Sequence, residues 1–372
     1  MLQDRPGGVG VYIDQICSRI LRLNPDTVIY TGTPDVRRAW LEGTEVKGIG
    51  ARLLPASTVG AGARRRARRL LWLASEVAFQ LPRDRVDVLF SPVQEGPLVG
   101  GVPSCVVVHD LTALKYPDAY DRLTVAQTRW LLPLMLKHAR EVVAVSQNTR
   151  RDVIQTFGLA PERVSVVGEG YDGAVFRPRD ALEVAEVRAR YGLGGRYLLY
   201  AGTFSRHKNL GVIVEAMARL PESAGDVVLA LVGPTDAGHY AELEATVRRL
   251  GLNNRVKVLG YVSRDSLAAL MSEAAAFVYP SRYEGFGLAP LEAMACGAPV
   301  LVSNVASLPE VVGLGGTLVT GETPEAWGRA IERVLMVDRS SVRRGALEQA
   351  ARYQWDDAAA ALLDVLRRAT RV

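Results

Sequence analysis

Two glutamates, Glu284 and Glu292, stand with seven residues between them in the stretch SRYEGFGLAPLEAMACG at residues 281–297. An apolar run precedes this stretch, so we expect Glu284 in a loop after a strand and Glu292 about one turn inside the following helix. Gly285 and Gly287 carry no Cβ and let backbone N–H groups come close to a ligand. Because carboxylates accept hydrogen bonds from paired hydroxyls, which ribose and hexose both present, the spacing indicates one glutamate for each sugar of a nucleotide sugar.

A second polar group, GTFSRHKN at residues 202–209, lies between an expected strand and a helical pattern that begins at Leu210. A helix N-terminus supplies N–H groups and the positive end of the helix dipole, and Arg206 and Lys208 add fixed charge. Together these features suit a diphosphate. The alternative is ordinary solvent-facing charge at a helix start.

Short β-branched runs alternate with stretches of helical period along the chain, and this pattern occurs twice. Continuous apolar strands that alternate with helices predict parallel sheets covered on both faces. We therefore predict an α/β protein with two Rossmann-like, doubly wound domains and a ligand bound where the carboxyl ends of their strands face each other. The predicted strands span residues 27–30, 86–90, 105–108, 142–145, 164–167, 197–201, 227–232, 256–259, 276–279 and 300–303.

The glycine-rich segment GEGYDGAVFRPR at residues 168–179 predicts the connection between the two domains. We expect an N-terminal domain over residues 1–175, a C-terminal domain over residues 176–354, and a helix at 355–372 that packs back on the N-terminal domain. The glycine loop at residues 7–10 has only six residues before it, so the strand that should precede it is missing. A start placed too far downstream and a shortened protein with a weakened N-terminal domain are the alternatives.

The composition excludes several classes of protein. No apolar run approaches the ~20 residues that span a bilayer, and the N-terminus lacks the regions of a signal peptide, so we expect a cytoplasmic protein. Three scattered cysteines and four histidines make a disulfide framework or a structural zinc site improbable. No motif typical of nucleic-acid binding is found.

The net charge is +5, from 45 basic and 40 acidic residues, and one cluster of arginines accounts for the whole excess. An apolar run, LLWL at residues 70–73, follows the cluster directly, which makes the segment a candidate amphipathic helix for an anionic membrane at the inner face. The alternative is a solvated helix face. The cluster consists of Arg64, Arg65, Arg66, Arg68 and Arg69.

The motif that runs from Glu284 to the sequence EAMACGAPV resembles the Glu-x7-Glu motif of retaining glycosyltransferases of family 4, which have the GT-B fold. Similar matches extend over almost the whole chain. They are GGVGVY at residues 7–12, VVVHDL at 106–111, AVSQNTRRDV at 144–153, AGTFSRHKNL at 201–210 and SLPEV at 307–311.

The resemblance implies a role for each matching residue of the C-terminal domain. Glu292 would bind the ribose hydroxyls, and Glu284 would hold the transferred sugar with the backbone N–H groups of Gly285, Phe286, Gly287 and Leu288. Lys208 would contact the diphosphate. Thr203 stands where many members have arginine, so the charge there would fall on Lys208 with Arg206 or His207. Tyr261 and Val262 would lie against the base.

In the N-terminal, acceptor-side domain, His109 would face the donor sugar, and Gly8 and Gly10 would let their loop approach the diphosphate and the acceptor. A strand-end histidine is otherwise often a structural residue. Glu310 is better explained as a first-turn charge at a helix start, and Ser146 as a helix N-cap.

The resemblance further implies transfer of a hexosyl group from a UDP or GDP sugar to a hydroxyl of a glycan or lipid-linked acceptor. The product would be an α-linkage, as in bacterial polysaccharide synthesis, with no metal and no cofactor. One alternative is a nucleotide-sugar-binding protein with little transfer, because the first strand is missing. An oxidoreductase or epimerase is disfavoured, since no GxGxxG follows a strand.

Overall fold

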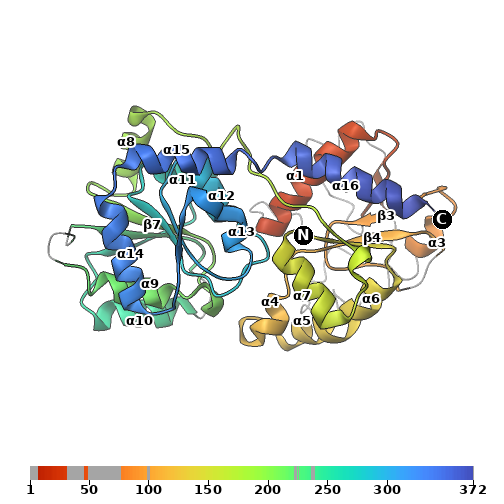
Figure 1. Cartoon of the computed structure of the whole chain (residues 1–372), viewed down its shortest axis with the longest axis horizontal. Coiled ribbons are helices and arrows are strands. Elements are labelled where there is room, and N and C mark those ends of the chain that lie inside the picture. Colours follow the sequence, from red (N-terminus) through yellow and green to blue (C-terminus); the bar gives the residue numbers. More distant parts are fainter. Residues whose placement is uncertain are drawn as a thin grey trace. The chain divides into compact units, whose positions relative to one another are not determined.

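The structure is a computed structural model that describes residues 7–31, 46–48, 77–98, 101–221, 224, 226–235 and 239–371. The chain forms two compact units (Figure 1). Unit 1 consists of residues 1–169 and 355–372, and unit 2 of residues 170–354. The chain therefore leaves unit 1 after Glu169 and returns to it at Trp355.

Unit 1 is built on a parallel sheet with the strand order β3-β4-β5-β6. All five residues of β4 are buried, as expected for a strand covered on both faces. A separate parallel pair is formed by β1 (Ile29–Thr31) and β2 (Val46–Gly48). The strands of the larger sheet are β3 (Leu89–Ser91), β4 (Ser104–Val108), β5 (Glu141–Ala144) and β6 (Val164–Val166).

Helices cover both faces of the unit 1 sheet, with α1 and α16 on one face and α6 and α7 on the other (Figure 1). The helix α16 is tied to α1 by an ion pair between Arg19 Nε and Asp356 Oδ1 at 2.6 Å and by the rings of Tyr12 and Trp355. The α-helices of unit 1 are α1 (Gly8–Leu23), α3 (Ala78–Gln80), α4 (Thr112–Lys115), α5 (Arg122–Ala126), α6 (Leu132–His138), α7 (Gln147–Phe157) and α16 (Trp355–Thr370). A π-helical segment, η4 (Gln127–Leu131), joins α5 to α6. The described residues of unit 1 also include the 3₁₀ turns η3 (Pro117–Ala119) and η5 (Pro161–Arg163).

Unit 2 contains a parallel sheet of six strands in the order β12-β11-β10-β7-β8-β9. The first strand along the chain, β7, lies in the middle, and the strand order changes direction between β7 and its neighbour β10. In open α/β sheets a ligand binds beyond the carboxyl ends of the strands at such a switch point. The strands are β7 (Tyr197–Ala201), β8 (Val228–Val232), β9 (Val256–Gly260), β10 (Ala276–Tyr279), β11 (Val300–Ser303) and β12 (Thr317–Val319).

The helices of unit 2 pack in two groups, in which α9 contacts α10 and α14, while α11 contacts α8 and α12 (Figure 1). The described α-helices of unit 2 are α8 (Ala181–Arg190), α9 (Leu210–Met217), α10 (His239–Arg249), α11 (Arg264–Glu273), α12 (Leu288–Ala295), α13 (Leu308–Val312), α14 (Pro324–Met336) and α15 (Arg339–Ala350). The described residues of unit 2 also include the 3₁₀ turns η6 (Arg206–Lys208) and η8 (Gly313–Gly315).

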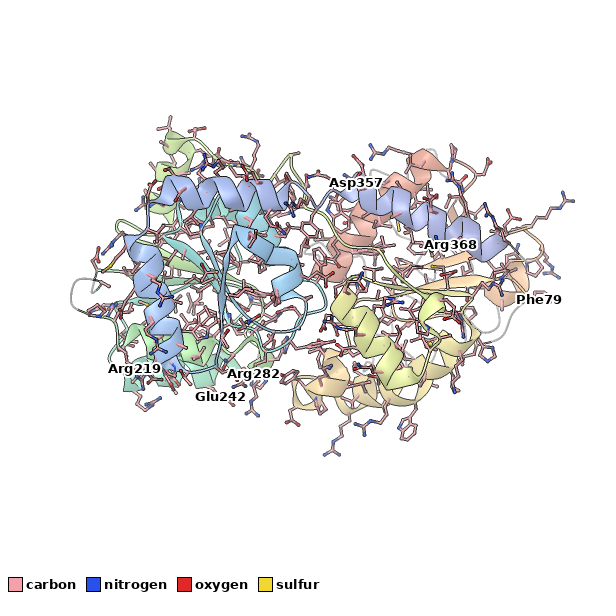
Figure 2. The ribbon with its side chains drawn as sticks, viewed as in Figure 1. Phe79, Arg219, Glu242, Arg282, Asp357 and Arg368 are labelled. Atoms are coloured by element: carbon pink, nitrogen blue, oxygen red, sulfur yellow. The ribbon has the colours of Figure 1, made fainter. Side chains whose placement is uncertain are left out.

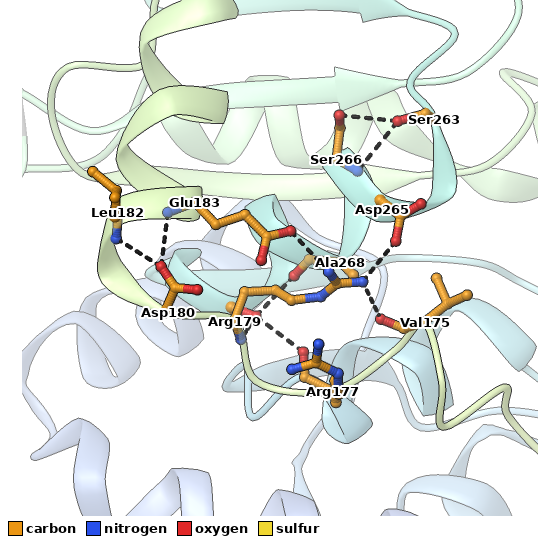
Figure 3. Close-up of polar contacts among 11 residues, drawn as sticks. Val175, Arg177, Arg179, Asp180, Leu182, Glu183, Ser263, Asp265, Ser266 and Ala268 are labelled. Atoms are coloured by element: carbon orange, nitrogen blue, oxygen red, sulfur yellow. Dashed lines mark hydrogen bonds and ion pairs between the residues drawn. The ribbon is translucent and has the colours of Figure 1, made fainter.

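The segment that follows the crossing into unit 2 is held down by Arg179 (Figure 3). Its guanidinium donates to Glu183 Oε1 and Asp265 Oδ1, each at 2.8 Å, and to the carbonyl of Val175 at 2.7 Å. Arg179 therefore joins the connection to both α8 and α11, within unit 2.

The structure differs from the sequence prediction at the glycine loop of residues 7–10. Gly8 and Gly10 belong to the first turn of α1, with Gly7 as the N-cap residue, rather than to a loop. Glycine is tolerated at a helix N-cap, and the apolar face of α1, with Tyr12 and Ile16 buried, favours helix from this point. Among the described residues, α1 is the first element along the chain, and none of the described helices has the length and apolarity needed to cross a bilayer.

Candidate functional site

The two polar stretches singled out in the sequence follow neighbouring strands of unit 2. Residues 202–209 follow β7, and residues 280–287 follow β10. The strands β7 and β10 pair in parallel, with Ala276 opposite Leu198. Their carboxyl ends therefore lie at the same edge of the sheet, at its switch point, and a hydrogen bond from the N–H of Arg282 to the carbonyl of His207 at 2.8 Å joins the two loops.

The charged pair at this edge is formed by Lys208 and Glu284. Lys208 Nζ lies 2.5 Å from Glu284 Oε1 and 3.1 Å from the hydroxyl of Tyr279. Only 11% of the Lys208 side chain and 13% of the Glu284 side chain are exposed. The ammonium also lies 5.2 Å from the centroid of the Tyr279 ring, within the range of a cation–π contact. The two opposite charges are thus held together with little solvent between them.

Two buried serines fix the position of Glu284. The hydroxyl of Ser281 donates to Glu284 Oε1 at 2.5 Å, the same oxygen that Lys208 contacts. The hydroxyl of Ser307 lies 3.1 Å from the Glu284 carbonyl and 2.6 Å from the Phe286 carbonyl, so it holds the loop backbone. Both serine side chains are fully buried. The carboxylate is therefore oriented by its neighbours rather than by solvent.

Tyr279 is a buried phenol beside these charges. Burial, followed by the charge of Glu284, raises its pKa well above its ordinary value. The phenol therefore keeps its proton at neutral pH.

Glu292 lies in α12 and is 9% exposed. Its negative charge contributes, after burial, to the raised pKa of the Cys296 thiol, which lies at about 12. Glu284 lies in the loop before α12 and Glu292 lies in α12, as the sequence predicted. Gly297, with φ +78°, ends this helix, also as expected.

Gly287, which lies between the two glutamates, leaves little room for a larger residue. Gly287 has φ +115°, and a Cβ there would lie 3.0 Å from Leu308 Cδ2. Phe286 is buried and packs edge-on against Tyr353, with ring centroids 5.7 Å apart. At the start of α12, the backbone N–H groups of Leu288 and Ala289 precede the first hydrogen bond of the helix, in which the Leu291 N–H donates to the Gly287 carbonyl at 3.2 Å.

The other residues of the loop after β7 are arranged differently from Lys208. The guanidinium of Arg206 pairs with Glu242 of α10 at 2.7 Å, with more than half of each side chain exposed; Glu242 is labelled in Figure 2. Thr203 Oγ1 lies 3.1 Å from Ser205 Oγ, and His207 is buried. The structure therefore brings Lys208, but not the Arg206 guanidinium, into contact with Glu284.

Tyr261 and Val262 follow the edge strand β9, at the same end of the sheet. Tyr261 is 57% exposed and Val262 is buried. The ends of β7 and β8 lie close together, because a Cβ at Gly233 would lie only 1.9 Å from the carbonyl oxygen of Gly202. The N–H of Gly233 also donates to the carbonyl of Gly260, at the end of β9, at 3.0 Å.

In unit 1, His109 follows β4 and is buried. Its Nε2 lies 2.9 Å from the carbonyl oxygen of Pro92, and its Nδ1 lies 3.7 Å from Glu169 Oε1. The ring of Tyr12 packs edge-on against it at 4.8 Å. Both ring nitrogens therefore face polar groups of unit 1. Ser146 caps α7 through the N–H of Thr149, as the sequence predicted.

The arginine cluster at residues 64–69 lies outside the described residues. Within the part of the chain that the structure describes, no group of three or more histidine, cysteine, aspartate or glutamate side chains is placed to hold a metal ion. Sequence reasoning missed Tyr279, Ser281 and Ser307. Ser281 stands three positions before Glu284, and this short separation is the one signal that could have connected a serine with the glutamate.

The models of two glycosyltransferase families match the sequence. Residues 6–174 match the model described as Glycosyltransferase Family 4, and residues 183–353 match the model described as Glycosyl transferases group 1. The chain belongs to glycosyltransferase family 4. Its two Rossmann-like units are those of the GT-B fold.

Individual relatives of this family 4 chain include D-inositol 3-phosphate glycosyltransferase of Xylanimonas cellulosilytica, 36% identical over 241 residues, which are 62% of this chain and 57% of the relative. O-antigen chain mannosyltransferase B of Escherichia coli is 31% identical over 252 residues, which are 67% of this chain and 66% of the relative. The match spans between half and two thirds of the length of the curated relatives.

Solved structures share the fold over nearly the whole chain. Anabaena HepE, in complex with UDP and glucose, is similar with a TM-score of 0.76 and 20% identity, covering 98% of this chain and 97% of that one. Sucrose-phosphate synthase of Thermosynechococcus elongatus gives a TM-score of 0.77 and 21% identity, covering 97% and 93% of the two chains.

Proposed function

We propose that this family 4 chain transfers a hexosyl group from a nucleoside diphosphate sugar to a hydroxyl of a glycan or lipid-linked acceptor, with retention of the α-configuration. The observation that carries the proposal is the Lys208–Glu284 pair at the switch point of unit 2, with Glu292 on the following helix. The ligands in the HepE structures, UDP with glucose in one and UDP-glucose in another, support a nucleotide sugar as the ligand class.

In this proposal each charged group acts on one part of the donor. Lys208 contacts the diphosphate, Glu292 accepts hydrogen bonds from the ribose hydroxyls, and Glu284 accepts them from the hexose. Backbone N–H groups at the start of α12 add a positive potential. Tyr261 and Val262 lie against the base. For unit 1, the family pattern implies that His109 faces the donor sugar. It also implies that Gly8 and Gly10 let their segment approach the diphosphate and the acceptor.

The proposed reaction breaks the bond between the anomeric carbon and the diphosphate oxygen and forms a bond from that carbon to the acceptor oxygen on the same face. The acceptor proton passes to the leaving diphosphate. Negative charge grows on the diphosphate as the bond breaks, and Lys208 stabilises this charge without a covalent step. In this proposal the side chains contact the donor directly, without a metal ion or a cofactor.

The test is a binding screen followed by a turnover assay. We expect UDP-glucose or GDP-mannose to raise the apparent melting temperature of the wild-type chain, because a ligand that binds only the native state stabilises it. Lys208→Met should reduce hexosyl transfer about a hundredfold or more, whereas Lys257→Met, a lysine of β9 that contacts the Gly192 carbonyl, should leave it unchanged. Failure of every nucleotide sugar to bind would contradict the proposal, and binding without turnover would favour the binding-protein alternative.

We also place this transfer at an anionic membrane surface. The arginine cluster of the sequence supports this part, and so does a face of unit 1 formed by α5, η4 and α6. Large apolar side chains are exposed there, with Trp130 at 69%, Leu134 at 48% and Leu123 at 41%. Exposed cations accompany them on the same segment: Arg122, Arg129 and Lys137. Exposed aromatic and aliphatic side chains bordered by cations suit a surface that carries acidic headgroups.

Sedimentation with vesicles tests the membrane part separately. The wild-type chain should sediment with phosphatidylglycerol vesicles but not with pure phosphatidylcholine vesicles, and Trp130→Ala should weaken this binding several-fold. Leu182→Ala removes an apolar side chain that is 72% exposed on α8 of unit 2, and it should have no effect. Equal sedimentation with both kinds of vesicle would contradict membrane binding by charge.

A further inference from the structure

The carboxylate of Glu284 has two donors on one of its oxygens. Lys208 Nζ and the Ser281 hydroxyl both contact Oε1, each at 2.5 Å, so neither of these two donors occupies Oε2. The Tyr279 hydroxyl is also hydrogen-bonded to this carboxylate. Ser281 is fully buried and stands three residues before Glu284 in the same loop. A hydroxyl held in this way fixes the rotation of the carboxylate, which an ion pair with a flexible lysine alone would not do.

Resting on the proposed function, we propose that Ser281 is a positioning residue for recognition of the donor hexose. It holds Glu284 Oε1 so that Oε2 faces a hydroxyl of the transferred sugar. The ligand class is a nucleoside diphosphate hexose that carries a free hydroxyl at the position facing Glu284. Ser281 itself touches only protein groups, and it acts through the carboxylate.

The proposed role of Ser281 concerns the hexose of the ligand and not its nucleoside diphosphate. Glu292 and Lys208 are assigned to the nucleoside diphosphate, and Glu284 to the hexose. Loss of the Ser281 hydroxyl leaves Lys208 in place, and Glu284 keeps its charge. Binding of a free nucleoside diphosphate should therefore be unaffected, while binding of the sugar nucleotide should weaken. A serine with a merely structural role would change both affinities together.

The experiment compares the affinities of UDP and UDP-glucose, and in parallel of GDP and GDP-mannose, by titration calorimetry with the full chain. Ser281→Ala should weaken binding of the sugar nucleotide about five- to tenfold, the effect of one hydrogen bond to a charged group, and change the diphosphate affinity less than twofold. Ser281→Cys, of similar shape with a weaker donor, should fall between wild type and Ser281→Ala.

The matched control is Ser272→Ala. Ser272 is an equally buried serine of unit 2, and its hydroxyl donates to the Ala268 carbonyl at 2.8 Å within α11. It should change neither affinity, and thermal unfolding without ligand verifies that every variant is folded.

The outcomes separate the positioning role from the proposed function. Equal weakening of both ligands by Ser281→Ala, or no weakening of either, overturns the role of Ser281 while the wild-type chain still binds both. Absence of binding by the wild-type chain overturns the proposed function and the role of Ser281 with it.

Discussion

Removing Lys208 should destabilise unit 2 far more than removing a typical surface lysine. At the 2.5 Å that separates Nζ from Glu284 Oε1, two unit charges attract by about 6–7 kcal/mol at an effective dielectric constant of about 20. Desolvation of the two ions offsets much of this energy. Once the lysine is absent, however, the mostly buried carboxylate of Glu284 keeps its desolvation cost without its counter-charge. We therefore expect Lys208→Met to lower the free energy of unfolding by about 3 kcal/mol.

A double-mutant cycle separates the pair energy from the packing of each side chain. Lys208→Met combined with Glu284→Gln should be less destabilising than the sum of the single changes, with a coupling energy of about 2 kcal/mol. The comparison pair is Arg196 and Asp226, which lie 2.7 Å apart in the same unit but are 44% and 60% exposed. A cycle on this exposed pair should give less than about 0.5 kcal/mol.

Hydrogen exchange is the suitable assay, because a chain of two units does not unfold in one step. Mass spectrometry of peptides from β7 and β10 reports the opening free energy of the sheet that carries the pair. If Lys208→Met changed this energy by less than about 0.5 kcal/mol, or if the two cycles gave equal coupling, the interpretation of Lys208 and Glu284 as a buried ion pair would be refuted.

Two further predictions concern other side chains of the fold. Glu292→Ala should weaken binding of a free nucleoside diphosphate about tenfold or more in calorimetry, because a carboxylate that accepts two hydroxyl hydrogen bonds is lost. Glu325→Ala, at the exposed start of α14, should not weaken this binding. If the Glu292→Ala variant and the wild-type chain bound the diphosphate with equal affinity, the ribose role of Glu292 would be contradicted. Burial raises the pKa of two fully buried thiols to about 12 from an ordinary 9.0, so these thiols should resist a disulfide reagent at pH 8 until the chain unfolds. Since the thiols of the unfolded chain ionise at lower pH than those of the native chain, the contribution of their burial to stability is present below pH 9 and is lost as the pH rises toward 12. Rapid modification of these thiols in the native chain would contradict the prediction that they resist the reagent. The two thiols are those of Cys105 and Cys296.

The sheets were predictable from the sequence because their strands are buried on both faces and read as continuous apolar runs. The runs at 197–201 and 276–279 have the bounds of β7 and β10. The edge strand β12 was missed, since its three residues include the exposed Thr317 and show no apolar run. The strand β2, also of three residues, gives an equally weak signal.

The candidate site was predictable in part. The loop and helix positions of Glu284 and Glu292 follow from strand, glycine and helix signals that are local in sequence. The contact between Lys208 and Glu284 joins residues 76 positions apart, and it depends on the parallel pairing of β7 with β10, which no local pattern reveals. The pairing of Arg206 with Glu242 rather than with site residues was likewise hidden, because it depends on where α10 packs.

The central claim is that a nucleotide sugar binds to unit 2 against Lys208 and the two glutamates. The most direct test is a crystal structure of the chain with a bound UDP or GDP hexose. We predict Lys208 Nζ within hydrogen-bond distance of a diphosphate oxygen, Glu292 at the ribose hydroxyls and Glu284 Oε2 at a hydroxyl of the hexose. A donor bound elsewhere, or bound here with all three side chains directed away from it, would contradict the account.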